Sequence, residues 1–402
     1  MRRFLMIGML ILSLALLLHP DIFHLDKAKK LAKQVIIIDG HMDVPYRLKD
    51  KWEDIGAKTA NGHFDYPRAK AGGLDAPFMS IYIPVRYETE GGAKALAEEL
   101  IDMVKGFTQK HPDKFALVKT AADIKVNFKK GLISLPMGME NGAPIEGDLK
   151  NVQYFHNLGI RYITLTHSED NHICDSSYDE DHKWKGLSPF GKKLVKEMNR
   201  VGIMIDVSHI SDDAFYQVME LSEVPVIASH SSCRHFTPGF ERNMDDNMIK
   251  LLAKKDGVIM INFGSFFLEE TYNKKGKKAW DTLKAYLKKH NLKRSDPKVE
   301  AFRKEYKAKH PMPTLTVADV VAHIDHVVKL VGVDHVGLGS DFDGVEGLPT
   351  GLGDVSEIPN LIAALLEKGY SETDIEKICS GNVFRVWQAV EAYAASVMST
   401  LK

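Results

Sequence analysis

The residues of this sequence that are best suited to chemistry are histidines and carboxylates that follow short apolar runs. The chain has 17 His and 3 Cys, with no Cys-x-x-Cys pair, so a metal would be held by imidazole and carboxylate rather than by paired thiolates. The residues at the ends of apolar runs are His41 with Asp43, Glu140, His167, His209, His230 and Asp341. Imidazole nitrogen with carboxylate oxygen suits zinc, and manganese, cobalt or iron also fit.

The spacing of His41 and Asp43 indicates how two of these side chains could act together. His-x-Asp occurs at several places, but only the copy at His41 directly follows a strand-like run, Ile36–Asp39. Side chains two residues apart on a strand point the same way, so His41 and Asp43 could hold one ion together. Three His with Asp43 and Glu140 exceed what one catalytic zinc needs. A carboxylate bridging two ions about 3.5–4 Å apart would explain the surplus, and such a pair can present a hydroxide to a carbonyl carbon. The predicted chemistry is hydrolysis.

Eight apolar runs, each leading into polar residues, must position these side chains. The runs are Val35–Asp39, Phe78–Pro84, Ile133–Met139, Ile160–Thr166, Ile203–Ser208, Val224–Ser229, Gly257–Phe263 and His335–Ser340. The amphipathic segments between them include Ala93–Phe107, Pro189–Val201, Asp212–Leu221 and Val317–Val331. Runs rich in Val, Ile and Leu suit parallel strands covered on both faces. Strand then helix, repeated eight times, predicts an α/β fold of the (β/α)8 TIM-barrel class, whose active sites lie at the carboxyl ends of the strands. The alternative is a doubly wound sheet, but no Gly-rich phosphate loop supports it.

Residues 266–313 depart from this rhythm. They are dense in Lys, Arg and Glu and contain no strand-like run, so we expect a helical insertion between strands 7 and 8. Lys and Glu are interspersed there, which favours a solvated surface over a nucleic-acid patch. The whole chain has 53 Lys and Arg against 54 Asp and Glu, and this balance lacks the basic excess of a nucleic-acid-binding protein.

The first 20 residues have the layout of an export segment. Arg2 and Arg3 precede an apolar run from Phe4 to Leu18, which is typical of a secretory signal and short for a membrane span. No Ala-x-Ala cleavage site follows, so an uncleaved N-terminal anchor is the alternative. We therefore expect residues 1–20 to be a signal peptide or anchor and residues 21–402 to be one domain. The protein would be exported to the periplasm or the extracellular space, or anchored by this segment.

From about Val35 to Val386 the sequence resembles the membrane (renal) dipeptidases, binuclear zinc enzymes of the amidohydrolase type. The segments that carry the resemblance are Ile38–Pro45, Met139–Gly142, Arg161–His167, Asp206–His209, Ser229–Ser232, Arg242–Asn243, Gly339–Gly344 and Gly381–Val386. The resemblance implies two zinc ions per chain. His41 and Asp43 would hold one ion, His209 and His230 the other, and Glu140 would bridge them as part of the catalytic centre.

The resemblance also implies how a dipeptide would be bound and cleaved. His167 would contact the carbonyl oxygen as it becomes an oxyanion, and Asp341 would carry the proton. Arg242 would pair with the substrate carboxylate, with Asn243 beside it in the substrate site, because a guanidinium is the natural bidentate partner of a carboxylate.

Two local alternatives and one departure accompany these assignments. Arg234 could replace Arg242 as the carboxylate partner if the loop folds differently. Asp343 shares a face with Asp341 by strand alternation, although Asp341 directly follows the strand run and is the better proton carrier. The family often has Tyr after the seventh strand's Asn-Phe, whereas Asn262-Phe263 is followed by Gly264 here.

The sequence therefore predicts a zinc-dependent dipeptidase with small dipeptide substrates and a possible homodimer. The disulfides and lipid anchor of the mammalian relatives cannot be carried over to a chain with 3 Cys and no apolar C-terminal tail. A binuclear hydrolase of another small amide or ester, such as a β-lactam or lactone, is the alternative within the same chemistry. A catalytically silent binding barrel is the alternative outside it, but a silent copy would be expected to lack a ligand or the proton carrier, and all are present.

Overall fold

The computed structural model describes residues 20–294 and 296–400, with side chains from residue 24 onward. The expected signal or anchor at residues 1–20 lies almost wholly outside this range. Within the described residues, no helix combines the length and apolar character that a membrane crossing requires.

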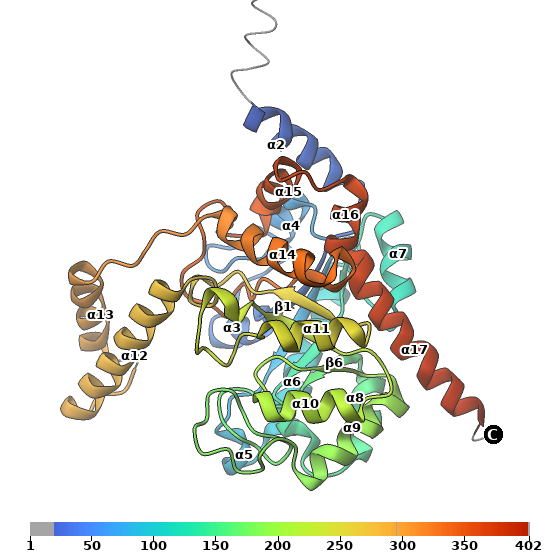
Figure 1. Cartoon of the computed structure of the whole chain (residues 1–402), viewed down its shortest axis with the longest axis horizontal. Coiled ribbons are helices and arrows are strands. Elements are labelled where there is room, and N and C mark those ends of the chain that lie inside the picture. Colours follow the sequence, from blue (N-terminus) through green and yellow to red (C-terminus); the bar gives the residue numbers. More distant parts are fainter. Residues whose placement is uncertain (1–19, 295, 401–402) are drawn as a thin grey trace, which may run out of the picture.

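Eight parallel strands form a barrel with helices around it (Figure 1). Their order is β1 (Ile38–Met42), β2 (Ala76–Tyr82), β5 (Met137–Glu140), β6 (Ile160–Thr164), β7 (Met204–Asp206), β8 (Ile227–Ser231), β9 (Val258–Ile261) and β10 (Val336–Leu338). The first and last strands meet through a parallel bridge between Met42 and Phe342. In this bridge the Asp43 amide donates to the Phe342 carbonyl at 2.9 Å. The predicted TIM-barrel class is confirmed.

The helices follow the strands in the expected alternation. They are α2 (Pro20–Leu31), α3 (Val44–Asp50), α4 (Tyr66–Gly72), α5 (Tyr87–Glu90), α6 (Ala93–Lys110), α7 (Ala121–Lys129), α8 (Lys150–Leu158), α9 (Pro189–Val201), α10 (Asp212–Leu221), α11 (Asp246–Lys254), α12 (Glu270–His290), α13 (Pro297–Lys309), α14 (Val317–Val331), α15 (Ile358–Glu367), α16 (Glu372–Glu376) and α17 (Asn382–Thr400). Side-chain caps define where several of them begin. The Ser188 hydroxyl accepts from the Gly191 amide at the start of α9, and Ser211 accepts from Ala214 at the start of α10. These contacts satisfy amides that a helix leaves unpaired at its first turn.

Two strand predictions were wrong in detail. The first strand is Ile38–Met42, so His41 lies within it and not after it. The run Ile133–Met139 forms two strands separated by Pro136, which has no amide hydrogen for a continuous ladder. Its first half, β4 (Ile133–Leu135), pairs outside the barrel with β3 (Phe115–Leu117), a strand that the sequence pattern did not indicate.

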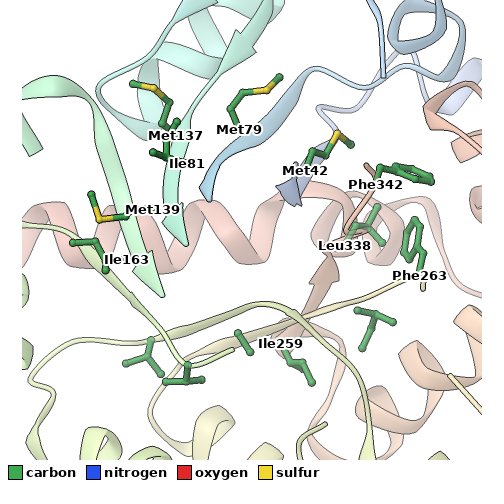
Figure 2. Packing of buried hydrophobic residues seen from close by; sticks show 14 of the residues in the cluster. Met42, Met79, Ile81, Met137, Met139, Ile163, Ile259, Phe263, Leu338 and Phe342 are labelled. Carbon is green, nitrogen blue, oxygen red and sulfur yellow. The ribbon is translucent and has the colours of Figure 1, made fainter. Parts of the chain in front are cut away.

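Alternate residues of the strands pack into two separate apolar clusters. Along β9, Ile259 and Ile261 belong to the larger cluster, whereas Val258 and Met260 belong to the smaller one. Figure 2 shows part of the larger cluster. The smaller cluster also contains Tyr162 of β6 and Trp387 of α17, both buried. The smaller cluster thus packs bulky apolar side chains next to the polar residues at the carboxyl ends of the strands.

The insertion between β9 and β10 is helical, as predicted, and projects from the barrel as an arm made of α12 and α13 (Figure 1). Basic residues far outnumber acidic ones between residues 270 and 309. α12 buries Leu283 and α13 buries Val299, while most of the other side chains of the arm are exposed or half-buried. Stacking of Tyr286 on Phe302, with ring centroids 4.1 Å apart, joins the two helices.

Candidate metal centre and active site

The residues singled out in the sequence converge at the carboxyl ends of the barrel strands. Seven residues on six strands, or in the loops directly after them, make up the group. They are His41 on β1, Asp43 directly after β1, Glu140 on β5, His167 after β6, His209 after β7, His230 on β8 and Asp341 after β10. All of these side chains are buried except that of His167, which is 21% exposed. Burial of several ionisable groups in one place is stable only when they compensate one another or bind a cation.

Glu140 lies at the centre of this group, with each carboxylate oxygen facing a different set of imidazoles. Oε2 is 3.4 Å from His41 Nε2. Oε1 is 3.1 Å from His209 Nε2 and 3.3 Å from His230 Nε2. Asp43 Oδ2 is 3.5 Å from His41 Nε2, on the Oε2 side. One carboxylate therefore separates two sets of nitrogen and oxygen ligands.

Proximity alone permits more than one grouping of these ligands. His41, Glu140 and His230 lie within ligating distance of one another, and so do Glu140, His167 and His209, and also His41, Asp43 and Asp341. The rings of His41 and His230 stack with centroids 3.8 Å apart. The family resemblance implies that His41 and Asp43 hold one ion and that His209 and His230 hold the other. This geometry allows that arrangement among others.

A hydrogen-bond relay fixes the tautomer of His41. Its Nδ1 lies 2.7 Å from the hydroxyl of Tyr162, and that hydroxyl donates to the Gly40 carbonyl at 3.1 Å. Because the tyrosine proton is already used, Nδ1 of His41 must be the donor in the first contact. The lone pair of Nε2 is then available on the side of Glu140, as a ligating histidine requires.

His230 has a second relay of the same kind. Its Nδ1 lies 2.7 Å from Ser229 Oγ, and that hydroxyl donates to Asp206 Oδ2 at 2.6 Å. Asp206 also accepts from the backbone amides of Ser208 and Ser229. The Nε2 lone pair of His230 is therefore free as well. Sequence reasoning missed Tyr162, Ser229 and Asp206, although all three stand within segments that resemble the family: Arg161–His167, Ser229–Ser232 and Asp206–His209.

The donor set fits divalent cations. Within the described residues, His41 Nε2 and Asp43 Oδ1 are buried without a hydrogen-bond partner. His209 Nε2 and His230 Nε2 lie only 2.9 Å apart. Burial lowers the pKa of His209 and of His230 well below the usual value, and the nearby positive charge of Arg242 lowers both further. Two neutral imidazoles whose Nε2 atoms lie this close, both beside Glu140 Oε1, suit a ligand pair for a cation such as zinc.

Asp341 is held beside this centre in a strained backbone conformation. Its φ of 62° lies in the left-handed region, and its Oδ2 accepts from Asn262 Nδ2 at 2.8 Å. Burial, and next the negative charge of Asp43, raise the pKa of Asp341 well above its ordinary value. Gly344 turns the chain over both carboxylates: a Cβ atom there would lie 2.1 Å from Asp43 Oδ2 and 2.4 Å from Asp341 Oδ1.

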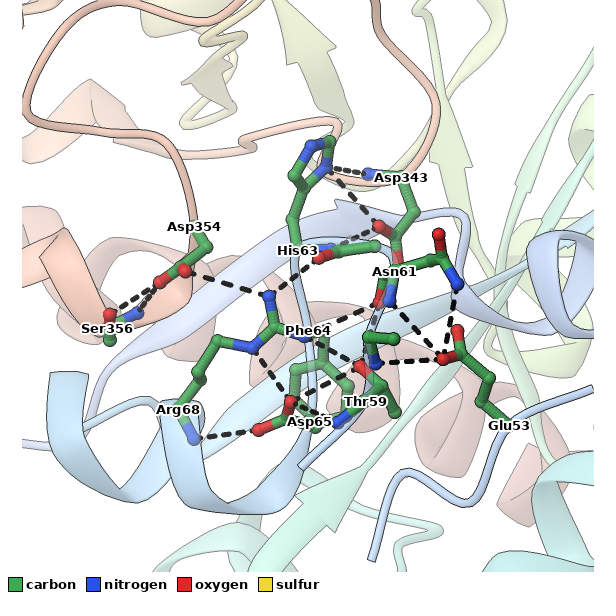
Figure 3. Close-up of polar contacts among 12 residues, drawn as sticks. Glu53, Thr59, Asn61, His63, Phe64, Asp65, Arg68, Asp343, Asp354 and Ser356 are labelled. Atoms are coloured by element: carbon green, nitrogen blue, oxygen red, sulfur yellow. Dashed lines mark hydrogen bonds and ion pairs between the residues drawn. The ribbon is translucent and has the colours of Figure 1, made fainter. Parts of the chain in front are cut away.

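Asp343 does not share the face of Asp341, because β10 has already ended and Asp343 also has a positive φ of 71°. Its carboxylate instead accepts from Arg47 Nε at 2.9 Å and from the His63 amide at 2.6 Å. Figure 3 shows Asp343 within a polar network that continues through Asn61 to Arg68. The prediction that Asp343 follows strand alternation was wrong, and its charge serves to hold this loop.

The two arginine candidates have different surroundings. Arg234 donates from both Nη1 and Nη2 to Asp212, at 2.7 and 2.5 Å. Its guanidinium therefore has no free pair of nitrogens for bidentate binding of a substrate carboxylate. Arg242 is 3% exposed and donates from Nη1 to Ser231 Oγ and from Nη2 to the His230 carbonyl. Among the described residues it forms no carboxylate pair, and its Nε has no partner. The geometry favours Arg242 as the group that meets a substrate anion.

Asn243 lies in the same loop, but its amide holds the loop together. Its Nδ2 donates to Thr237 Oγ1 at 2.7 Å and to the Phe267 carbonyl at 2.8 Å, and its Oδ1 accepts from the Ser232 amide at 3.1 Å. Both amide protons are used within the chain. Asn243 therefore stabilises the loop that carries Arg242, and its contact with substrate stays a prediction.

Tyr178 is a further residue at the carboxyl ends of the barrel strands, a region called the barrel mouth below. Sequence reasoning did not single it out. It lies in the long loop between β6 and α9, with its ring 6.0 Å from that of His209 and 6.1 Å from that of Phe240. Tyr178 is 40% exposed as a residue, and its hydroxyl lies close enough to Arg242 for the guanidinium charge to act on its pKa. Burial of the hydroxyl raises its pKa to about 12. No motif in the sequence marks Tyr178, because the loop brings it to the site over a long range.

Comparisons with known proteins agree with this geometry. The model of the family described as membrane dipeptidase (peptidase family M19) matches residues 25–400. The dipeptidase tcpJ of Claviceps purpurea is 32% identical over 373 residues, which cover 89% of this chain and 78% of that protein. A probable dipeptidase, PvdM, from Pseudomonas aeruginosa superimposes with a TM-score of 0.78 at 27% identity, covering 92% of this chain and 99% of the other. A metallopeptidase from Rhodobacter sphaeroides, solved with a phosphinate mimic of the dipeptide L-Ala-D-Ala, gives a TM-score of 0.73 at 26% identity, covering 89% and 99%.

Proposed function

This chain belongs to the membrane dipeptidase family of metallopeptidases, and we propose that it hydrolyses dipeptides with two zinc ions held at the barrel mouth. The observation that carries the proposal is the position of Glu140, whose two oxygens face His41 on one side and His209 with His230 on the other. A carboxylate in this position suits a bridge between two cations.

In this proposal His41 and Asp43 hold one ion, His209 and His230 hold the other, and Glu140 contacts both. When bound, the ions would supply the nucleophilic hydroxide and polarise the scissile carbonyl. The relays through Tyr162 and Ser229 keep two of the imidazoles in the ligating tautomer. The chain's own contribution is thus a rigid set of lone pairs that is already in place before substrate arrives.

Asp341 is the proposed proton carrier. Its carboxylate lies beside Asp43, and Asn262 orients it through a single hydrogen bond. Cations held by Asp43 and Glu140 would offset the negative charge that raises its pKa, and so leave it able to take a proton and return it to the leaving amine. His167, on the other side of Glu140, is kept neutral by burial, which lowers its pKa. It is placed to donate a hydrogen bond to the carbonyl oxygen as negative charge develops.

Arg242 and Tyr178 are the proposed partners of the substrate carboxylate. Both lie at the mouth of the site, where the Arg242 guanidinium acts on the pKa of the Tyr178 hydroxyl. The guanidinium of Arg242 would lie at a fixed distance from the reacting carbonyl. It would therefore select substrates in which one residue separates the scissile bond from a free carboxylate. A dipeptide meets this requirement, as does the C-terminal bond of a longer peptide, and the bound dipeptide mimic in the relative from Rhodobacter sphaeroides supports the dipeptide.

Export of the protein remains a proposal that rests on the sequence of residues 1–20. The basic residues Arg2 and Arg3 and the apolar run after them support a location outside the cytoplasm, with membrane contact through this segment if it is not cleaved. Fractionation of cells that express the full chain tests this. Active full-length enzyme found solely in the cytosol would contradict it.

Hydrolysis of a dipeptide panel by zinc-loaded protein tests the proposed function. We expect free dipeptides to be cleaved, and N-blocked dipeptides and tripeptides to be cleaved far more slowly. Elemental analysis should give close to two ions per chain, and a chelator should abolish activity reversibly. Cleavage of a β-lactam or lactone in preference to every dipeptide would overturn the substrate assignment, and full activity with one ion would remove Glu140 from its bridging role.

A further inference from the structure

A second cluster of possible metal ligands lies outside the barrel mouth. It is made of His235 in a short 3-10 turn (Arg234–Phe236), Asp246 at the start of α11 and His326 on α14. Each of the three residues offers one ligand atom, and these atoms lie within 4.8 Å of one another. None of these residues contributes to the centre around Glu140.

The surroundings of this outer cluster suit a cation that enters from solvent. His326 Nε2 lies 2.8 Å from Asp246 Oδ1, and the rings of His235 and His326 stack with centroids 4.3 Å apart. His326 and Asp246 are partly buried, whereas His235 is exposed. Because His235 is exposed, its ring can turn from the stacked position to direct a nitrogen at the other two groups.

We propose that His235, Asp246 and His326 bind a third divalent cation of the zinc class. Two imidazoles and one carboxylate are the protein ligands of many zinc sites, with water completing the tetrahedron. The same set disfavours magnesium and calcium, which take mainly oxygen ligands. The site is therefore chemically selective although it is close to the surface.

Such a cation would join three elements that together hold the substrate loop. His235 and Asp246 lie on either side of Arg242 in the chain, and the segment between them is closed by a backbone contact from the Arg234 amide to the Met244 carbonyl at 2.8 Å. A cation shared with His326 would fasten both ends of this segment to α14. The third ion is thus expected to stabilise the loop that carries Arg242 without contacting substrate.

Equilibrium dialysis of the full chain against Zn²⁺ tests this proposal. We expect the wild-type protein to bind one ion more than His326→Ala, with a loss of affinity at the third site of at least about 10–100-fold, the range seen even for altered outer-shell partners. His235→Ala should give the same result and, because His235 is exposed, it should fold. His310→Ala, which alters a histidine at the end of α13, is the matched control and should retain the extra ion.

The difference between proteins, not the total, decides the outcome. If the barrel mouth binds fewer than two ions, all of the totals fall together and the difference of one ion remains. Excess Zn²⁺ should raise the Tm of the wild-type protein more than that of either variant, while kcat of the variants stays at the wild-type value. Equal binding by wild type, His326→Ala and His235→Ala would overturn the proposal, and so would loss of the extra ion in His310→Ala.

Discussion

The barrel mouth and the arm of α12 and α13 are both dense in charged side chains, yet the two regions use charge in different ways. At the mouth, Glu140 is 3% exposed and faces four imidazoles. In the arm, Glu305 pairs with Lys309 at 2.6 Å, and both side chains are about two-thirds exposed. The mouth keeps its charges where water cannot solvate them, whereas the arm leaves its charges in solvent.

This difference shows that burial distinguishes a functional group of charges from a solvated one better than their number does. A buried carboxylate costs several kcal/mol unless neighbouring groups compensate it, so it persists only where a partner or a cation is present. A solvated pair between residues four apart on a helix contributes little. The same side-chain change should therefore have a large effect in one region and almost none in the other.

The largest effect is expected from Asp341→Asn, which replaces a carboxylate with an amide of the same shape. If Asp341 carries the proton, kcat should fall by about 10²–10⁴-fold while the metal content stays unchanged. Steady-state kinetics on a free dipeptide, with elemental analysis of the same sample, measure both quantities. A variant with wild-type kcat would transfer the proton role to another group, and loss of metal would make Asp341 a ligand.

The next effect is expected from Arg242→Ala, which removes the proposed carboxylate partner. A lost charge-assisted contact should weaken substrate binding by about 1.5–3 kcal/mol, mainly through KM. Esterification of the dipeptide should impair the wild-type enzyme strongly and this variant hardly at all.

Arg303→Ala is the matched arginine control in the arm, where the half-buried Arg303 pairs with Glu346 at 3.5 Å. It should leave KM for the free acid unchanged. An Arg242→Ala enzyme that still discriminates fully between acid and ester would show that another residue, such as Arg234, binds the carboxylate.

The relay behind His230 should matter less than these direct contacts. Ser229→Ala removes the acceptor of the His230 Nδ1 proton and a donor to Asp206, so zinc affinity should fall by roughly 10–100-fold. Titration against a competing chelator measures the change. Ser396→Ala on α17 is the control, because that exposed hydroxyl contacts only the Tyr393 carbonyl among the described residues. Equal affinities in the two variants would show that the relay does not tune the metal site.

The sequence predicted the barrel strands, and marked the side chains that meet at the mouth, because local rules govern strand ends. Apolar runs marked all eight barrel strands, and parallel strands bring their carboxyl ends to one edge wherever the helices lie. The failures lie where the chain stops following a regular period. Pro136 divided a single apolar run into two strands, and the positive φ of Asp341 and Asp343 ended the alternation on which their shared face depended.

The residues that contact the candidate ligands could not be predicted from the sequence, for a different reason. Tyr162 on β6 reaches His41 on β1 across the barrel. Asp206 reaches His230 through Ser229 on the neighbouring strand. Tyr178 approaches His209 only when a long loop folds back. Asn243 was assigned to the substrate because it adjoins Arg242, but its amide protons are used within the loop. Contacts between residues far apart in the chain depend on tertiary packing, which no local pattern records.

A smaller effect on KM is expected from Tyr178→Phe, which removes one hydroxyl that we propose contacts the substrate carboxylate. The loss of a hydrogen bond at a partly exposed position should raise KM for a free dipeptide by about twofold to tenfold, or about 0.5–1.5 kcal/mol. kcat should change little, because Tyr178 does not contact the metal ligands through its hydroxyl. Tyr306→Phe in α13 makes the same change in the arm and should leave KM unaltered. If Tyr178→Phe lowers kcat with KM unchanged, the hydroxyl acts on the transition state instead.

The smallest effect is expected from Glu305→Gln, which repeats in the arm the change of carboxylate to amide made in Asp341→Asn. Glu305 lies on a projecting helix and loses only a solvated contact with Lys309. High-dielectric solvent screens that contact, so Tm should stay within roughly 2 °C and kcat/KM should not change. Thermal unfolding and dipeptide kinetics on the two variants side by side measure the contrast directly. A fall in kcat/KM in Glu305→Gln would mean that the arm reaches the substrate or the mouth, and that its exposed charges belong to the catalytic apparatus after all.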